Sequence, residues 1–173
     1  TLLNQLDDVA TITVSEQSAL VQSSSCGASF IGDKWVVTAS HCVEGASLDS
    51  LKVNVGEYNL SNGANNAKAI KQIYMHPQYN EGASFNNDIA LIELKESINS
   101  PAIALASSSL TQQLTEMAST ATVIGWGNRT AYGADEEQPA NSQPDILHQV
   151  DLSLLTNTQC KDKLAQGYSD LQN

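Results

Sequence analysis

His41 and Asp88 are residues of the types that carry out acid–base chemistry, and each lies at the end of an apolar run. His41 follows the β-rich residues 35–39 (WVVTA), and Asp88 stands directly before residues 89–94 (IALIEL). A buried, hydrogen-bonded carboxylate can orient an imidazole and stabilise its protonated form. Taken singly, Asp88 is more simply explained as a turn residue. The spacing alone leaves His41 equally open to a structural role.

The cysteines add a possible constraint on the histidine. Cys42 directly follows His41, and Cys26 lies sixteen residues earlier, beyond a turn and two expected strands. A hairpin that returns on itself could bring the two sulfurs within bridging distance, but an unrelated thiol beside the histidine fits the spacing as well. Cys160 is left over, and an odd cysteine in a secreted protein indicates a missing partner or a free thiol.

The charge balance excludes several classes of partner. The 173 residues include 8 Lys and Arg against 19 Asp and Glu, for a net charge of −11. So acidic a chain is unsuited to nucleic acid and to anionic membrane surfaces. No apolar run approaches the roughly 18–20 residues that a membrane span requires. The hydrophobic fraction of 41% is enough for a packed core.

Short β-rich runs separated by polar turns predict an all-β barrel or sandwich. Strands are expected within residues 9–14, 29–31, 35–39, 51–55, 67–74, 89–94, 120–125 and 147–155. The nearly continuous apolar run 89–94 predicts a buried strand, and a short helix is expected after Thr156 or Asn157. Because two or three strands cannot close a barrel, we expect exposed apolar surface and open strand edges within residues 120–173.

Four segments occur in an order that is similar to a known family. They are CGASFI (26–31), WVVTASHC (35–42), NNDIALIEL (86–94) and GWGN (125–128). This set resembles CGGSLI, WVVTAAHC, DNDIALLKL and GWG of the chymotrypsin/trypsin-like serine endopeptidases. LKVNVGEYNL, IYMHPQYN and VDLSLLTNTQC extend the resemblance over essentially the whole chain. It implies an all-β, chymotrypsin-like double β-barrel, with a near-complete first barrel (1–105), a connector (106–119) and a partial second barrel (120–173).

The resemblance also implies roles for individual residues. His41 corresponds to the general base and later acid, and Asp88 to the carboxylate that orients it. Cys26 and Cys42 correspond to a disulfide that flanks the histidine. Phe85 corresponds to a residue lining the pocket for the side chain that precedes the scissile one.

The family's nucleophile segment, Gly-Asp-Ser-Gly-Gly, does not occur in the sequence, nor does its Ile-Val-Gly-Gly start. Gly-Ala-Ser occurs at 27–29, 45–47 and 82–84, but no glycine follows two places later, so none matches a nucleophile elbow. The family partner of Cys160 would also lie beyond Asn173. We therefore expect this chain alone to lack the serine and to be inactive, as a fragment or part of a zymogen.

The resemblance implies no cofactor and no metal. A calcium site near Glu57 and Asn59 is the less favoured alternative, because the Asn- and Gly-rich loop that follows lacks further carboxylates. His76 and His148 share no zinc-binding spacing with His41. The expected partners are protein or peptide substrates, protein inhibitors and an activating protease.

Two functions remain in competition at this stage. The first is a secreted trypsin-like serine endopeptidase that hydrolyses peptide bonds through a Ser-His-Asp triad. The second is a catalytically inactive protease homologue that acts as a binding protein. Retention of both His41 and Asp88 favours the first, and the residue at the serine position would discriminate between them. The ordered motifs disfavour an unrelated β-sandwich module.

Overall fold

A computed structural model of the chain describes residues 9–14, 24–62, 67–130, 137 and 143–170. It contains two compact units, which are described separately: residues 1–104 with 125–148, and residues 105–124 with 149–173. The division expected from sequence, at 1–105, 106–119 and 120–173, stays a prediction. Within the described part of the chain, no helix combines the length and apolarity that crossing a membrane requires.

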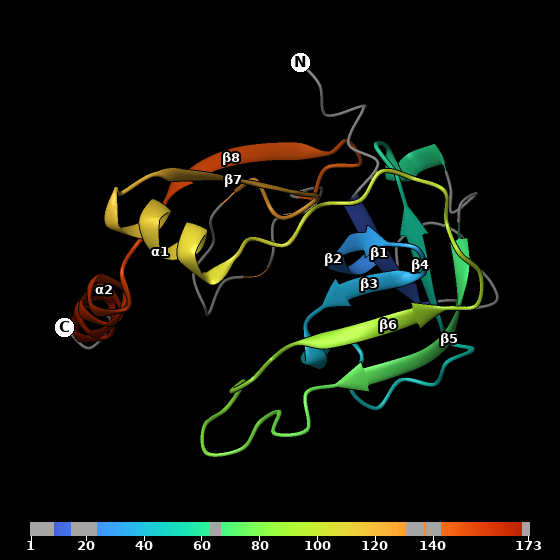
Figure 1. Ribbon diagram of the computed structural model, residues 1–173, viewed down its shortest axis with the longest axis horizontal. Helices are drawn as coiled ribbons and strands as arrows, with labels where there is room; N and C mark the ends of the chain where they lie inside the picture. The colour runs from blue at the N-terminus through green and yellow to red at the C-terminus, as the bar shows by residue number, and fades with distance from the viewer. Residues whose placement is uncertain (1–8, 15–23, 63–66, 131–136, 138–142, 171–173) are drawn as a thin grey trace. The chain divides into compact units, whose positions relative to one another are not determined.

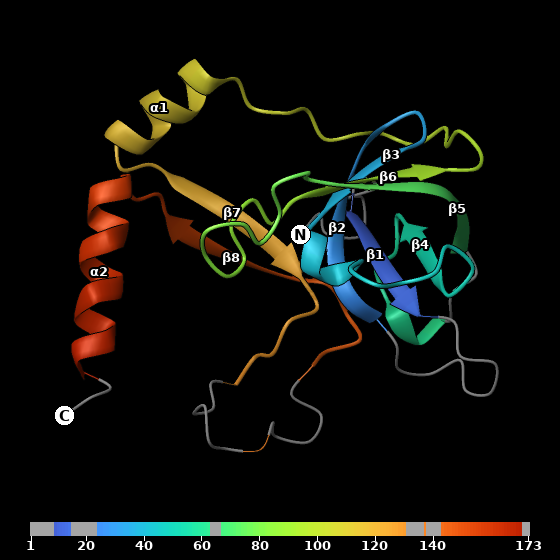
Figure 2. The ribbon, with the colours of Figure 1, turned by 90° about the horizontal axis from the view of Figure 1, so that it is seen from below.

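The first unit is built on a closed antiparallel barrel (Figures 1 and 2). Its strands occur in the order β1-β2-β3-β6-β5-β4, and β1 pairs with both β2 and β4 to close the sheet. Their bounds are β1 (Val9–Val14), β2 (Ser24–Gly32), β3 (Trp35–Thr38), β4 (Leu51–Val55), β5 (Ala67–Met75) and β6 (Ala90–Leu94). All six strands expected before residue 95 are therefore confirmed, and closure leaves the barrel without a free edge.

The core of this barrel follows the two-residue period of its strands. In β6, Ala90, Ile92 and Leu94 are buried, whereas Leu91 between them is 38% exposed. Glu93 is also buried, at 5% exposed. The prediction that residues 89–94 form a buried strand is thus correct except at Ile89 and Leu91, which are 50% and 38% exposed. The other core side chains come from all around the barrel: Phe30, Val36, Val43, Leu51, Val53, Val55 and Ile70.

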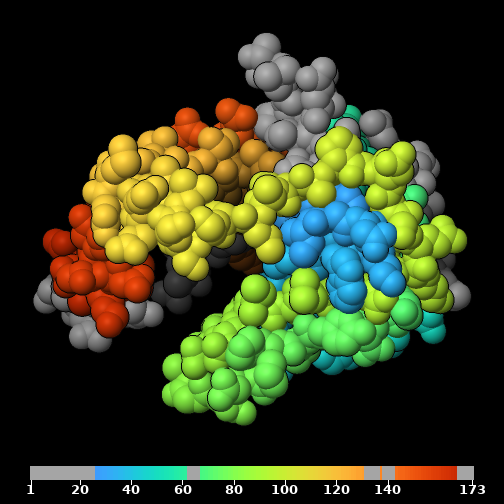
Figure 3. All heavy atoms as spheres, in the orientation of Figure 1, coloured from blue at the N-terminus to red at the C-terminus, as the bar shows by residue number. Residues whose placement is uncertain are grey.

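A segment after β6 lies against the hairpin formed by β2 and β3. The backbone N–H of Ile98 donates to the carbonyl of Asp33 (2.7 Å), and that of Ile103 donates to the carbonyl of Phe30 (3.1 Å). In Figure 3 the blue atoms of the hairpin are accordingly bordered by lime-green atoms of residues that follow β6. Gly32 (φ 114°) and Asp33 (φ 52°) make the tight hairpin turn between β2 and β3.

The second unit contains little regular sheet. Strands β7 (Thr120–Gly125) and β8 (His148–Ser153) form a two-stranded sheet, so each has an unpaired edge within the described residues. Val123, Val150 and Leu152 are each about half exposed on these strands. The exposed apolar surface and open edges expected within residues 120–173 are therefore present.

Two helices complete this unit. Helix α1 (Ser108–Glu116) lies in the stretch expected to be a polar connector, and the hydroxyl of Ser107 caps it by accepting from the N–H of Leu110 (3.2 Å). Helix α2 (Asn157–Asp170) begins where a helix was expected. Thr156 and Gln159 form a reciprocal capping box, which selects Thr156 of the two predicted caps.

Candidate active site

His41 lies in a short 3₁₀ turn, η2 (Ser40–Cys42), immediately after strand β3. Two hydroxyl side chains that precede the histidine anchor this backbone. Ser40 is fully buried, and its hydroxyl donates to the carbonyl of Ile89 (2.7 Å). The hydroxyl of Thr38 donates to the carbonyl of Gly27 (3.0 Å). The backbone that carries the imidazole is therefore held to β2 and to the start of β6.

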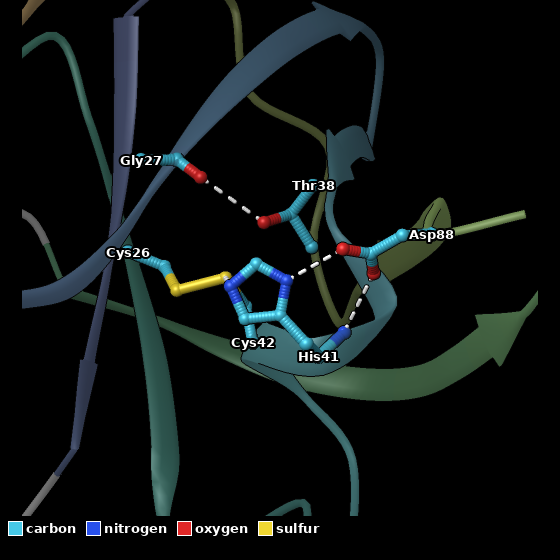
Figure 4. The surroundings of a disulfide bond; sticks show 6 residues. All are labelled: Cys26, Gly27, Thr38, His41, Cys42 and Asp88. Atoms are coloured by element: carbon cyan, nitrogen blue, oxygen red, sulfur yellow. Dashed lines mark hydrogen bonds and ion pairs between the residues drawn. A yellow bond between two sulfur atoms is a disulfide. The ribbon is translucent and has the colours of Figure 1, made fainter. Parts of the chain in front are cut away.

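A disulfide between Cys26 and Cys42 adds a covalent anchor beside the histidine. It joins strand β2 to the 3₁₀ turn, with the two α-carbons 6.1 Å apart. Figure 4 shows the disulfide at one edge of the His41 ring and Asp88 at the other. The two cysteines are thus bridged, and the alternative of an unrelated thiol is wrong. Cys160 is exposed and belongs to no disulfide.

Asp88 is positioned by a loop rich in asparagine between β5 and β6. Asn80 and Asn87 adopt positive φ angles of 63° and 54°, a conformation that asparagine tolerates better than most residues. The amide of Asn87 donates to the carbonyl of Gln78 (3.0 Å), and His76 N–H donates to the carbonyl of Ile89 (3.0 Å). These bonds close the loop on itself and bring Asp88 to a residue 47 positions earlier in the chain.

The carboxylate of Asp88 contacts His41 at two points. Its Oδ2 lies 2.6 Å from Nδ1 of the ring, and its Oδ1 accepts from the backbone N–H of His41 at 2.8 Å. A carboxylate acceptor at Nδ1 favours the tautomer that carries its proton there, which leaves the lone pair on Nε2. The side chain of His41 is half exposed (49%) and its Nε2 lies 3.5 Å from Sγ of Cys42, whereas the side chain of Asp88 is only 19% exposed.

The electrostatics of the pair favour an ionised carboxylate. Partial burial pushes the pKa of Asp88 upward, but the hydrogen bonds from the ring and the backbone of His41 act in the opposite direction. The net effect is a pKa below the usual 3.8. A charged carboxylate at Nδ1 would stabilise an imidazolium that forms when Nε2 takes a proton.

Phe85 lies against the histidine ring from the same loop. The two rings meet edge to face, with centroids 5.8 Å apart and planes at 85°. Phe85 has a positive φ of 60° and its backbone N–H donates to the side-chain oxygen of Asn80 (3.0 Å). The phenyl group is 64% exposed, so it offers an apolar surface beside the imidazole.

The residues considered for calcium have other partners. The side-chain oxygen of Asn59 accepts from both the N–H (2.9 Å) and the hydroxyl (2.6 Å) of Ser61. Glu57 is buried and is itself engaged in an interaction. Residues 63–66 of the loop that follows lie outside the described residues. Among the described residues, the side chain of Asn59 therefore stabilises a local turn with Ser61.

A charge cluster on the barrel was missed in the sequence analysis. Glu93 in β6 is buried, and its Oε1 lies 2.8 Å from Nζ of Lys34 and 2.9 Å from Nζ of Lys71. Tyr74 donates its hydroxyl to Oε2 (3.2 Å). Hydrogen bonds from Lys34 and then Lys71 lower the pKa of Glu93 from 4.5 to about 2. The sequence signal for this cluster was an acidic residue, Glu93, within the apolar run 89–94.

Comparison with known proteins identifies the family to which this arrangement belongs. A model of the trypsin family matches residues 8–172 of the chain. The chain belongs to the trypsin family. It is 35% identical to human Trypsin-3 over 141 residues, and 33% identical to dog Anionic trypsin over the same length. These alignments cover 79% of the chain but only 41% and 51% of the two trypsins, so the chain spans about half their length.

A solved structure agrees with the family assignment. The VesB protease of Vibrio cholerae superposes with a TM-score of 0.71 at 29% identity, covering 92% of this chain and 44% of that one. The fold is therefore the trypsin-like double β-barrel in partial form, with the first barrel closed and the second represented by β7 and β8. Trypsin-like proteases generally need no cofactor.

Proposed function

We propose that this chain is part of a secreted serine endopeptidase of the trypsin family, in which His41 is the general base and Asp88 its orienting carboxylate. The observation that supports this proposal is the two-point contact between Asp88 and His41, which favours the tautomer with its lone pair on Nε2. Retention of both His41 and Asp88 in this contact favours an enzyme over an inactive homologue that only binds a partner. The disulfide at the site suits a secreted protein, because such bonds persist in oxidising compartments.

The proposed reaction is acyl transfer through a serine supplied by sequence outside the printed residues. Nε2 of His41 takes the proton of the serine hydroxyl as its oxygen attacks the peptide carbonyl. The imidazolium, stabilised by Asp88, then gives that proton to the leaving amine. Water hydrolyses the acyl-enzyme by the same proton transfers. Without the serine, His41 has no nucleophile to activate, so the 173-residue chain alone would be inactive.

Substrate contact is proposed for Phe85 as well. Its exposed ring, set edge-on to His41, would form one wall of the pocket for the side chain that precedes the scissile residue. Peptides and proteins are the proposed substrates, with an activating protease and protein inhibitors as further partners. The whole protein would be made as a zymogen and act as a protease once it is activated.

The experiment is active-site labelling of the full-length protein after proteolytic activation. A serine-reactive phosphonate should label one serine, and peptide hydrolysis should accompany the labelling. His41→Ala should lower kcat by on the order of 10⁴-fold or more, the size of loss seen when a triad member is removed in this class of enzyme. Absence of labelling in the activated wild-type protein would instead support the binding protein.

His76→Asn is the matched control for this experiment. His76 is the other histidine of the Asp88 loop, and its Nδ1 accepts from the N–H of Gln78 (3.2 Å), a bond that an asparagine oxygen can also accept. This variant should keep wild-type labelling and hydrolysis. A loss as large as that of His41→Ala would show that damage to the loop, and not loss of the base, explains both variants.

A further inference from the structure

The disulfide and the histidine place three metal-ligating atoms together. Sγ of Cys26, Sγ of Cys42 and a ring nitrogen of His41 all lie within 4.8 Å of one another. Nε2 of His41 is 3.5 Å from Sγ of Cys42. With zinc bonds of about 2.3 Å to sulfur and about 2.0 Å to nitrogen, a tetrahedral site separates nitrogen from sulfur by about 3.5 Å. The nitrogen and one sulfur therefore already have the spacing of a zinc site.

We propose that, when the bond between Cys26 and Cys42 is reduced, the two thiolates and Nε2 of His41 bind one Zn²⁺ ion. Asp88 already prepares the histidine for this role, because it holds Nδ1 at 2.6 Å and leaves the lone pair on Nε2. A carboxylate on the second nitrogen is the arrangement that orients metal-bound histidines in zinc proteins. Water would be the ligand at the fourth position of the tetrahedral site.

The chemistry requires a dithiol reductant. The dithiol transfers two electrons and two protons to the disulfide, the S–S bond breaks, and the dithiol itself becomes a disulfide. Zn²⁺ then displaces one proton from each cysteine thiol into solvent, since the thiolate is the ligand. The oxidised chain offers no thiolate at this position and would not bind the ion.

Metal binding would also block the histidine. Nε2 cannot accept a proton from a serine while it donates its lone pair to zinc. If the proposed function is correct, the reduced, zinc-bound chain would be held inactive until a disulfide oxidant takes two electrons from the two thiolates. The bond between Cys26 and Cys42 then closes, the oxidant becomes a dithiol and the metal is released. The binding itself does not depend on the proposed function, and it is measured without any assay of proteolysis.

The test uses the chain carrying Cys160→Ser, which removes the free thiol outside the cluster. The chain is reduced with a dithiol, freed of it under argon, and titrated with ZnCl₂ by calorimetry, or with CoCl₂ by thiolate-to-metal charge-transfer absorption. We expect one ion per reduced chain and none per oxidised chain. Circular dichroism with zinc bound should show the β-rich spectrum of the oxidised chain.

Two variants and one control separate the folded site from adventitious thiol binding. His41→Ala should weaken zinc binding by at least about 100-fold, and Asp88→Asn by about 10- to 100-fold, whereas His76→Asn should leave the affinity unchanged. Equal affinity of wild type and Asp88→Asn would overturn the proposal, because an unfolded chain would bind without the carboxylate. Failure of the reduced chain to bind zinc, or a zinc-bound chain without β structure, would also overturn it.

Discussion

Asp88 holds His41 by both of its oxygens, one on Nδ1 of the ring at 2.6 Å and one on the backbone N–H at 2.8 Å. The second bond matters because it fixes the carboxylate to the same residue whose ring it orients. The carboxylate at Nδ1 favours the tautomer that carries its proton there. This pair can be studied in the chain as it stands, without a nucleophile.

The pKa of Asp88 should depend on the ring of His41. His41→Ala removes the strongest stabilising partner of the carboxylate while keeping the backbone N–H, so the pKa should rise from its lowered value toward or above 3.8. The measurement is a ¹³C NMR titration of the aspartate carboxyl carbons. His76→Asn serves as the control and should leave the Asp88 titration unchanged. A wild-type pKa above 3.8 would contradict the hydrogen-bonded pair.

Glu93 should make stability depend on pH in the acid range. Its pKa is about 2 in the folded barrel and 4.5 in its ordinary state, so the ionised form favours folding. That stability is fully present above pH 4.5 and is lost as the pH falls toward 2. Urea unfolding should therefore give a lower free energy of unfolding for Glu93→Gln than for the wild type at pH 7. This difference should become smaller as the pH falls from 4.5 to 2.

The exposed neighbour Glu96 provides the matched control for this measurement. Glu96→Gln should leave the pH dependence of unfolding close to that of the wild type. If the difference in free energy of unfolding between the wild type and Glu93→Gln stays constant from pH 7 to pH 2, the lysines of the cluster do not favour the ionised carboxylate.

The two faces of β6 should respond differently to truncation. Ile92 is fully buried in the barrel, so Ile92→Ala should lower the free energy of unfolding by about 2–5 kcal/mol. Leu91 is 38% exposed on the same strand, and Leu91→Ala should cost much less. Chemical denaturation of both variants measures the difference. Equal losses would mean that the alternation along β6 is wrong.

The hydroxyl of Ser40 should contribute a single buried hydrogen bond. Ser40→Ala removes its bond to the carbonyl of Ile89, which still accepts from the N–H of His76. We therefore expect a loss of about 0.5–1.5 kcal/mol in the free energy of unfolding, with the fold retained. Denaturation gives the loss, and NMR chemical shifts of Asp88 show whether the pair stays in place. A loss of several kcal/mol would indicate that the bond organises the whole turn.

Phe85 should influence substrate choice more than the chemical step. In the activated full-length protein, Phe85→Ala should raise KM for peptides with a bulky apolar side chain before the scissile residue, because one wall of the proposed pocket is removed. Peptides with glycine at that position act as the control and should be hardly affected. Steady-state kinetics on the two peptide series provide the comparison, and equal changes in both would exclude a pocket role.

Sequence by itself determined the local structure of this chain. The two-residue alternation in runs such as 51–55 and the Gly32-Asp33-Lys34 turn specify strands and a hairpin through nearby residues alone. The helix start at Thr156 follows from a side chain that caps a backbone three residues away. Helix α1 was missed because a serine-rich run is equally typical of a loop and of a helix cap.

Only the tertiary structure decided how distant residues meet. Asp88 reaches His41 across 47 positions because the asparagine loop closes on itself and β3 pairs with β6, and no periodicity encodes that distance. The pairing of β6 with both β3 and β5 places Glu93 beside Lys34 and Lys71. The sequence motifs indicate His41 and Asp88 as candidate site residues, but the hydrogen bonds that orient them arise only when the barrel closes.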